Sequence, residues 1–238
     1  MYEEENFEID SQSYGAHTTL EKYTARTFGI MALGLLVTAI TAFVLNINYI
    51  GLRMWIGFPY LPIVLVVAQL GVAVAFTARL FKASVTTTRV MFFIYSILTG
   101  FTFSILQYVY DSTTIFLAFG ITCVYFAALC VIGFTTKMNL SKIFPILMVG
   151  LIAIIIFNIA SMFINLEAMD RVVCSVALVI FTLLTAYDTQ KMKKLFEQYQ
   201  GDELMLSRLS MYSALELYLD FINLFLRILQ ILGRNSRN

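Results

Sequence analysis

The stretch Leu215–Gln230, LELYLDFINLFLRILQ, is apolar except for a few polar side chains. Four of them, Glu216, Asp220, Asn223 and Arg227, follow one another at intervals of 4, 3 and 4 residues. Residues three or four apart share one face of an α-helix, so this spacing predicts a helix with one polar stripe. A stripe of this kind among Leu, Ile and Phe is typical of a membrane helix that turns its polar face toward other helices.

The composition of the whole chain supports a membrane location. The 238 residues are 60% hydrophobic and 13% charged, with a mean hydropathy of +0.82. A helix needs about 20 apolar residues to cross a hydrocarbon core about 30 Å thick. The apolar runs are continuous rather than alternating, which favours helices over a β-barrel. We therefore predict an all-α, polytopic membrane protein with seven transmembrane helices, at residues 27–46, 61–78, 90–108, 115–134, 144–164, 172–188 and 211–232.

The chain divides into one membrane domain and two tails. Residues 1–25 are acidic and polar, so we expect a disordered cytosolic tail rather than a signal peptide, which would begin with basic residues. Residues 26–233 form the predicted seven-helix membrane domain, and residues 234–238 form a short C-terminal tail.

The distribution of Lys and Arg predicts the orientation of the bundle. With seven spans, most basic residues fall on the side of the N-terminus: Lys22, Arg26, Arg79, Lys82, Arg89, Lys137, Lys142, Lys191, Lys193, Lys194 and Arg208. The other side receives Arg53, Arg171, Arg234 and Arg237. Cytoplasmic loops carry the excess of basic residues, which predicts a cytosolic N-terminus. A re-entrant seventh segment would place both termini in the cytosol.

The sequence lacks the patterns of most enzymes and cofactor sites. Cys123, Cys130 and Cys174 all lie within predicted spans and have no metal-ligand spacing, and His17 stands alone in the tail. We find no Gly-rich phosphate loop, no Ser/His/Asp pattern and no basic aromatic surface for nucleic acid. The sequence therefore predicts no enzymatic activity, no cofactor and no nucleic-acid partner, and leaves the lipid bilayer as the expected environment.

The ionisable residues at membrane depth are the candidate functional residues. Asp220 lies about 9–13 Å into the bilayer if its helix enters near residues 211–214, at a rise of about 1.5 Å per residue. A carboxylate at the centre of a membrane helix costs about 2.5–3.5 kcal/mol, so Asp220 should face the bundle interior. Asp188 and Arg79 end two spans that run antiparallel to this helix and finish on the side where it enters, at similar depth. Two carboxylates and a guanidinium are therefore predicted to meet.

Each of these residues also has a purely structural interpretation. Arg79 would be an ordinary helix-end residue whose charge reaches the interface, and Asp188 would lie in an interfacial turn. Glu216 would simply reach the interface. For Asn223 and Arg227 we expect packing and interhelical hydrogen bonds rather than ion ligation.

Two motifs carry a resemblance to a known family. LELYLDFINLFLRILQILG at 215–233 and AYDTQKM at 186–192, together with seven apolar spans, resemble the transmembrane Bax inhibitor motif family in its bacterial form. The resemblance implies a bundle with helix seven at its centre and a calcium leak governed by pH through a pair of aspartates. The pair falls on Asp188 and Asp220, and the arginine that bonds to it falls on Arg79. It also implies a role in calcium homeostasis and stress survival.

The chain departs from that family pattern in two places. An acidic residue found within helix two of at least one member has no counterpart here, where Ala68 and Gln69 stand. A basic residue late in helix seven corresponds to Gln230, with Arg227 one turn earlier. These differences concern ion selectivity and pore-blocking contacts rather than the aspartate pair.

The expected mechanism is a shared proton. Two carboxyl groups in one dry site cannot both ionise cheaply, so Asp188 and Asp220 are expected to titrate as a unit. Their protonation state would then select one of two packings of the sixth and seventh helices. Carboxylate oxygens suit a hard cation such as Ca²⁺, which we expect to bind transiently near the pair as the permeant ion.

Two alternatives from other functional classes remain open. One is a regulator without transport that binds a membrane protease or another membrane protein of the stress response. The other is an intramembrane aspartyl protease, because Tyr187 and Asp188 form a YD pair on the sixth span. Proteases of that class carry their second aspartate in GxGD, whereas Leu217–Asp220 reads LYLD. The compact length and acidic tail favour a bacterial plasma membrane.

Overall fold

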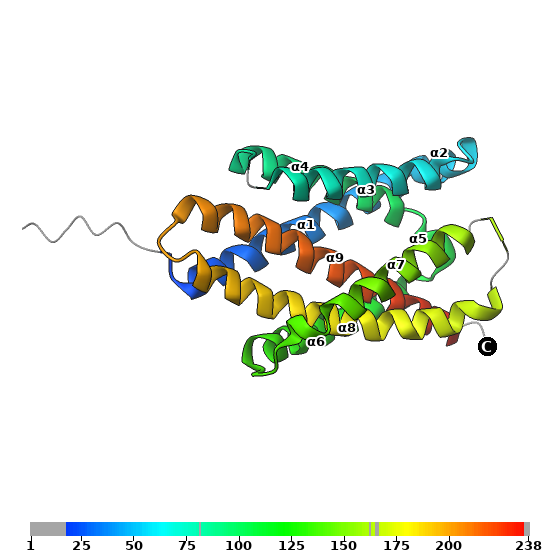
Figure 1. Cartoon of the computed structure of the whole chain (residues 1–238). Helices are drawn as coiled ribbons and strands as arrows, with labels where there is room; N and C mark the ends of the chain where they lie inside the picture. Colours follow the sequence, from blue (N-terminus) through cyan, green and yellow to red (C-terminus); the bar gives the residue numbers. More distant parts are fainter. Residues whose placement is uncertain (1–17, 81, 162, 165–166, 236–238) are drawn as a thin grey trace, which may run out of the picture.

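A computed structural model describes residues 18–80, 82–161, 163–164 and 167–235 (Figure 1). The helices are α1 (Leu20–Asn46), α2 (Ile50–Gly57), α3 (Leu61–Arg79), α4 (Val85–Phe103), α5 (Leu106–Val109), α6 (Ser112–Thr135), α7 (Phe144–Ser161), α8 (Glu167–Gln198) and α9 (Glu203–Asn235). Two 3₁₀ turns are η2 (Ile47–Tyr49) and η3 (Leu140–Lys142). The described residues contain no strand, which confirms the prediction of an all-α protein.

The long helices form a seven-helix bundle. Among the described residues, 6 helices are long and apolar enough to cross a membrane: α1, α3, α4 continued through α5, α6, α7 and α8. The remaining long helix, α9, has 33 residues and is therefore about 50 Å long, enough to span a bilayer. It is not among the 6, and charged side chains interrupt its apolar sequence. Such a helix needs other helices around it.

Helix α9 lies at the centre of the bundle. Figure 1 shows it between α1 and α4 on one side and α6 and α8 on the other, and it contacts all four. Several of its large side chains are almost completely buried: Leu206, Leu209, Met211, Leu217, Tyr218, Leu224 and Leu229. Helices α3 and α7, in contrast, expose many apolar side chains, as expected of lipid-facing surfaces. The prediction of a central seventh helix is confirmed.

Small residues and hydroxyl groups bring neighbouring helices close together. A Cβ added at Gly100 of α4 would lie 2.6 Å from the carbonyl oxygen of Thr38 in α1. The Thr38 hydroxyl donates to the Ser96 carbonyl of α4 at 3.0 Å and lies 2.6 Å from the Tyr218 hydroxyl of α9. Close contacts of this kind are the main source of helix association in lipid. They tie α1, α4 and α9 into one unit.

Several helices extend beyond the apolar runs that predicted them. Helix α1 begins at Leu20 rather than after residue 25, where Thr19 accepts a hydrogen bond from the Lys22 backbone at 3.3 Å and caps the helix. Helix α8 continues past Asp188 to Gln198. Hydropathy detects only the part of a helix that lies in lipid, because polar residues continue the same backbone ladder outside it. Residues 1–17 and 236–238 of the predicted tails lie outside the described residues.

Candidate functional site

The two predicted aspartates meet between the sixth and seventh long helices. Helices α8 and α9 run antiparallel and side by side, and they bring the carboxyl groups of Asp188 and Asp220 within hydrogen-bonding reach of each other. Asp220 is 4% exposed and Asp188 is partly buried. Ionised carboxylates only accept hydrogen bonds, so a bond between two carboxyl groups requires a proton on one of them. Two carboxyl groups at this distance are able to share one proton.

One oxygen of this pair lacks a partner. Asp220 Oδ2 is completely buried and receives no hydrogen bond from the described residues. A buried acceptor without a donor costs about 1–3 kcal/mol. The interaction between the two carboxyl groups must offset that cost.

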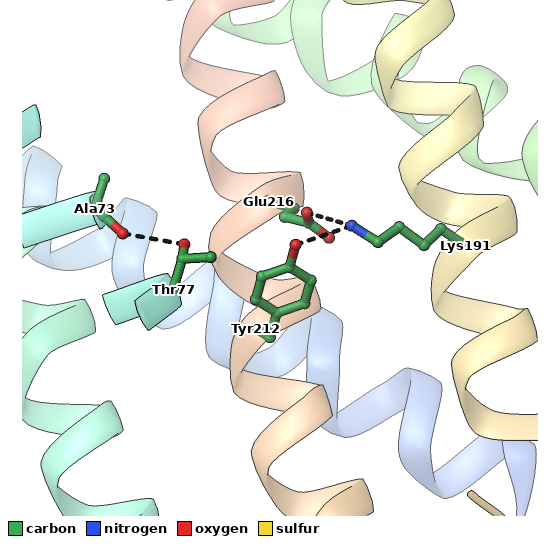
Figure 2. Close-up of polar contacts among 5 residues, drawn as sticks. All are labelled: Ala73, Thr77, Lys191, Tyr212 and Glu216. Atoms are coloured by element: carbon green, nitrogen blue, oxygen red, sulfur yellow. Dashed lines mark hydrogen bonds and ion pairs between the residues drawn. The ribbon is translucent and has the colours of Figure 1, made fainter. Parts of the chain in front are cut away.

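A charged group borders the aspartate pair on the same two helices. The Lys191 ammonium of α8 donates to Glu216 Oε1 at 2.6 Å and to the Tyr212 hydroxyl at 2.9 Å, both on α9. Figure 2 shows these three side chains pointing toward one another across the gap between the helices. The ammonium also lies 4.6 Å from the centre of the Tyr212 ring, which favours a cation–π contact. Glu216 is thus held by Lys191 rather than reaching the interface alone.

We name Asp188, Lys191, Glu216 and Asp220 the α8–α9 polar cluster. Both aspartates interact electrostatically with Glu216 and with Lys191. With one proton shared by the aspartates, a single negative charge remains unbalanced in this cluster. Loss of that proton doubles the imbalance. Like charges repel strongly where water is scarce, so loss of the proton would weaken the contact between the two aspartates.

The structure does not bring Arg79 to the aspartates. Its side chain is exposed at the end of α3, and no ion pair joins it to Asp188 or Asp220 in the part of the chain that the structure describes. Helix α3 packs mainly against α4. In Figure 2 the end of α3, marked by Thr77 and its hydrogen bond to the Ala73 carbonyl, lies on the other side of α9 from Lys191. Lys191, not predicted as a site residue, is the cation beside the pair.

Spacing along α8 could have indicated Lys191. It follows Asp188 by three residues, which places both side chains on the same helix face. In an antiparallel helix pair, a residue further along α8 meets a residue earlier on α9, so Lys191 is brought to Glu216 as Asp188 is brought to Asp220.

The two remaining residues of the polar stripe, Asn223 and Arg227, make hydrogen bonds within α9 or through the backbone of α9. Asn223 Nδ2 donates to the Leu219 carbonyl at 2.8 Å. Arg227 is 7% exposed, and its guanidinium donates to Gln230 Oε1 at 3.0 Å. The Arg227 carbonyl accepts the Cys174 thiol of α8 at a sulfur–oxygen distance of 3.7 Å. These contacts place Asn223 and Arg227 in helix packing, one or more turns away from the aspartates.

The described residues contain no group of three or more His, Cys, Asp or Glu side chains that could hold a metal ion. The carboxylate oxygens of the α8–α9 polar cluster are nevertheless of the type that Ca²⁺ prefers. Chemically, the cluster can exchange a proton and make brief contacts with a hard cation.

Comparison with known proteins places the chain in a family. The profile of the family described as inhibitor of apoptosis-promoting Bax1 matches residues 20–237. The inner membrane protein YbhL of Escherichia coli is 36% identical over 90% of this chain and 92% of its own length. A protein of Borreliella burgdorferi is 35% identical over 91% of this chain and 94% of its own, and protein RP147 of Rickettsia prowazekii is 32% identical over 90% of each. With its apolar helices, the chain is an integral multi-pass membrane protein.

Proposed function

The chain belongs to the family of inhibitors of apoptosis-promoting Bax1, and on that premise we propose that it is a pH-sensitive calcium leak of a bacterial plasma membrane, with its N-terminus in the cytosol. The observation that carries the proposal is the pair of Asp188 and Asp220, whose carboxyl groups lie within hydrogen-bonding reach of each other between α8 and the central helix α9. An ionisable pair at this depth is costly, and in membrane proteins such groups usually serve ion or proton movement.

The shared proton acts as the gate in this proposal. With the proton in place, the hydrogen bond holds α8 against α9. Without it, two like charges about 4 Å apart repel by about 4 kcal/mol at an effective dielectric constant of about 20. Loss of the hydrogen bond adds about 1 kcal/mol. The sum is close to the roughly 5.5 kcal/mol that moves a two-state equilibrium from 1:99 to 99:1. A single proton can therefore switch the packing of the two helices.

Lys191 gives the deprotonated state a counter-charge. Its flexible four-carbon stem lets the ammonium move between Glu216 and Asp188, which lies one helical turn away. The move would release the Glu216 carboxylate. Three carboxylates would then face the space between the helices, with oxygen ligands for a passing Ca²⁺.

Calcium entry into proteoliposomes loaded with a calcium-sensitive dye tests the proposal. We expect flux that depends on the protein and that changes between about pH 6 and about pH 8, because buried carboxyl groups that interact keep a proton to a higher pH than free ones. Asp188→Asn and Asp220→Asn should each remove the pH response while the protein still folds. The matched control is Asp111→Asn, at the exposed start of α6, which should keep the wild-type response.

Two outcomes would count against this function. If both aspartate variants respond to pH as the wild type does, the pair is not the gate. If wild-type flux equals that of empty liposomes at every pH, the protein is not a leak, and a regulator that binds a membrane partner becomes the better hypothesis.

The packing around Asp220 argues against intramembrane proteolysis. Leu217 and Tyr218 are fully buried, and Tyr218 packs edge-on against Phe92 and Tyr95 of α4. A protease needs room beside its aspartate for the backbone of a substrate, which glycines usually provide. Cleavage of a transmembrane substrate that is lost in Asp220→Ala would revive this alternative.

A further inference from the structure

A second polar site lies at one end of the bundle, outside the α8–α9 polar cluster. It is a cleft of about 350 Å³ between the end of α6, the connection to α7 and the last turns of α8. Its lining residues are Gly133, Phe134, Thr136, Lys137, Met138, Asn139, Gln190, Lys193, Lys194 and Glu197. The proposed leak uses none of them.

The cleft is positively charged. Three of its side chains are lysines, Lys137, Lys193 and Lys194, and only Glu197 carries a negative charge. The ion pairs among the described residues involve none of these four. Ammonium groups around one small volume repel one another unless an anion joins them. The charge of the cleft thus favours an anionic ligand.

The walls of the cleft are held in place by Gln190. Its side chain accepts a hydrogen bond from the Leu140 backbone at 3.2 Å and donates to the Met138 carbonyl at 2.8 Å, which fastens the α6–α7 connection to α8. Lys194 Nζ donates to the same Gln190 oxygen at 3.2 Å and to Asn139 Oδ1 at 3.4 Å. Lys194 therefore supports the wall, whereas Lys137 and Lys193 make no side-chain hydrogen bond to the residues that the structure describes.

Apolar side chains adjoin the cleft on the lipid side. Met138, in its lining, is 72% exposed. Val131 and Ile132, in the last turn and a half of α6, are 61% and 53% exposed. A positively charged cleft beside exposed apolar side chains of α6 matches the two ends of a phospholipid, with a charged phosphate headgroup and acyl chains.

We propose that this cleft binds the phosphate headgroup of an anionic phospholipid, with Lys137 and Lys193 contacting the headgroup and the acyl chains lying along α6. A free phosphate ion could use the same ammonium groups, but it would gain nothing from Met138 and the exposed surface of α6. This inference does not depend on calcium transport.

Lipid binding to the full-length protein in detergent micelles tests the inference. Native mass spectrometry can count bound phosphatidylglycerol across a titration, with zwitterionic phosphatidylcholine and inorganic phosphate as separate arms. A lysine near an anionic headgroup contributes about fivefold in affinity. Lys137→Gln/Lys193→Gln should therefore weaken phosphatidylglycerol binding about 25-fold, and Lys137→Arg/Lys193→Arg should retain it.

The matched control is Lys22→Gln/Lys82→Gln, which removes the same charge outside the cleft, from the first turn of α1 and from the connection between α3 and α4. It should change binding less than twofold. Equal losses in the two glutamine variants would show general surface electrostatics and overturn the site. Saturable binding of phosphatidylcholine or inorganic phosphate as tight as that of phosphatidylglycerol would overturn the choice of ligand.

Discussion

The α1–α4 and α8–α9 interfaces are both buried in the bundle, yet different kinds of residue form them. At the first, Gly100 brings the two backbones together, and the Thr38 hydroxyl satisfies a carbonyl of the neighbouring helix. At the second, two aspartates lie within hydrogen-bonding reach of each other beside the Lys191–Glu216 ion pair. One interface relies on shape and the other on charge.

The two kinds of contact differ in how many stable arrangements of the helices they allow. Close-packed surfaces have one good arrangement, because a shift of a few tenths of an ångström loses contacts and creates clashes. An interface with paired carboxyl groups can have two in the proposed mechanism, since gain or loss of one proton changes the interaction between those groups from attraction to repulsion. The α1–α4 interface is thus a fixed support, against which α9 is held by the Thr38–Tyr218 contact. In the function that we propose, the α8–α9 interface is the element that switches.

The largest loss of stability is expected when a large side chain is added to the close contact between α1 and α4. In Gly100→Leu the new Cβ would lie 2.6 Å from the Thr38 carbonyl oxygen and 2.6 Å from Thr41 Cβ, so the backbones of α1 and α4 must separate. We expect a loss of unfolding free energy of about 3 kcal/mol or more. The midpoint of unfolding in mixed micelles measures it. Gly120→Leu on α6, where nothing lies within 4 Å, is the control and should be neutral or stabilising. Equal losses in both would contradict shape as the basis of the α1–α4 contact.

The second largest loss of stability is expected when the positive charge of Lys191 is removed from the α8–α9 interface. Lys191→Met leaves Glu216 without its partner, and both side chains are mostly buried, at 24% and 20% exposure. Removing one member of a fully buried pair costs about 3–5 kcal/mol, and their partial exposure reduces this to about 2 kcal/mol. The same unfolding measurement tests it.

A double substitution separates the charge of Lys191 from its packing. Lys191→Met/Glu216→Gln should recover most of the lost stability, because no unpaired charge remains. If the double variant is no more stable than Lys191→Met alone, the alkyl chain of the lysine matters rather than its charge. The flux of the single variant should shift in pH response, since the cation beside Asp188 is gone.

The sequence predicted how far each residue lies into the membrane. The apolar runs located the long helices, and the intervals from Glu216 to Arg227 indicated an inward-facing stripe on α9. Asp188 and Asp220 were expected at matching depths on consecutive antiparallel helices, and the structure brings them together. Residues that are consecutive in the topology need only the right depth and face to meet.

The sequence did not predict in the same way which neighbouring helices each helix packs against. Arg79 has the expected depth, but α3 packs mainly against α4, so its end does not face the aspartates. A single apolar sequence specifies how far a residue lies into the membrane and says little about which neighbours its helix chooses. Lys191 was accessible to sequence reasoning because it shares a helix face with Asp188, yet its position near the helix end suggested an ordinary interfacial lysine.

The smallest effect is expected at Asp111, an exposed carboxylate that belongs to neither interface and serves as a reference for the buried ones. Asp111 caps α6 from the exposed side, accepting hydrogen bonds from the Thr114 backbone at 2.8 Å and from its hydroxyl at 2.6 Å. These bonds favour the ionised form and lower the pKa of Asp111 below its ordinary value of about 3.9. Its contribution to stability is therefore complete above about pH 4 and disappears as the pH falls through the lowered value.

Asp111→Asn should match the wild type in unfolding midpoint at neutral pH, because asparagine is an equally good cap. Below about pH 4 the wild type should lose stability more steeply than the variant, since only the wild type loses a charge there. Any pH response of ion flux near neutrality must then come from groups other than this exposed carboxylate. Parallel acid unfolding curves for the two proteins would show that the Asp111 cap has no part in pH-dependent stability, and would leave the buried α8–α9 carboxyl groups as the source to examine.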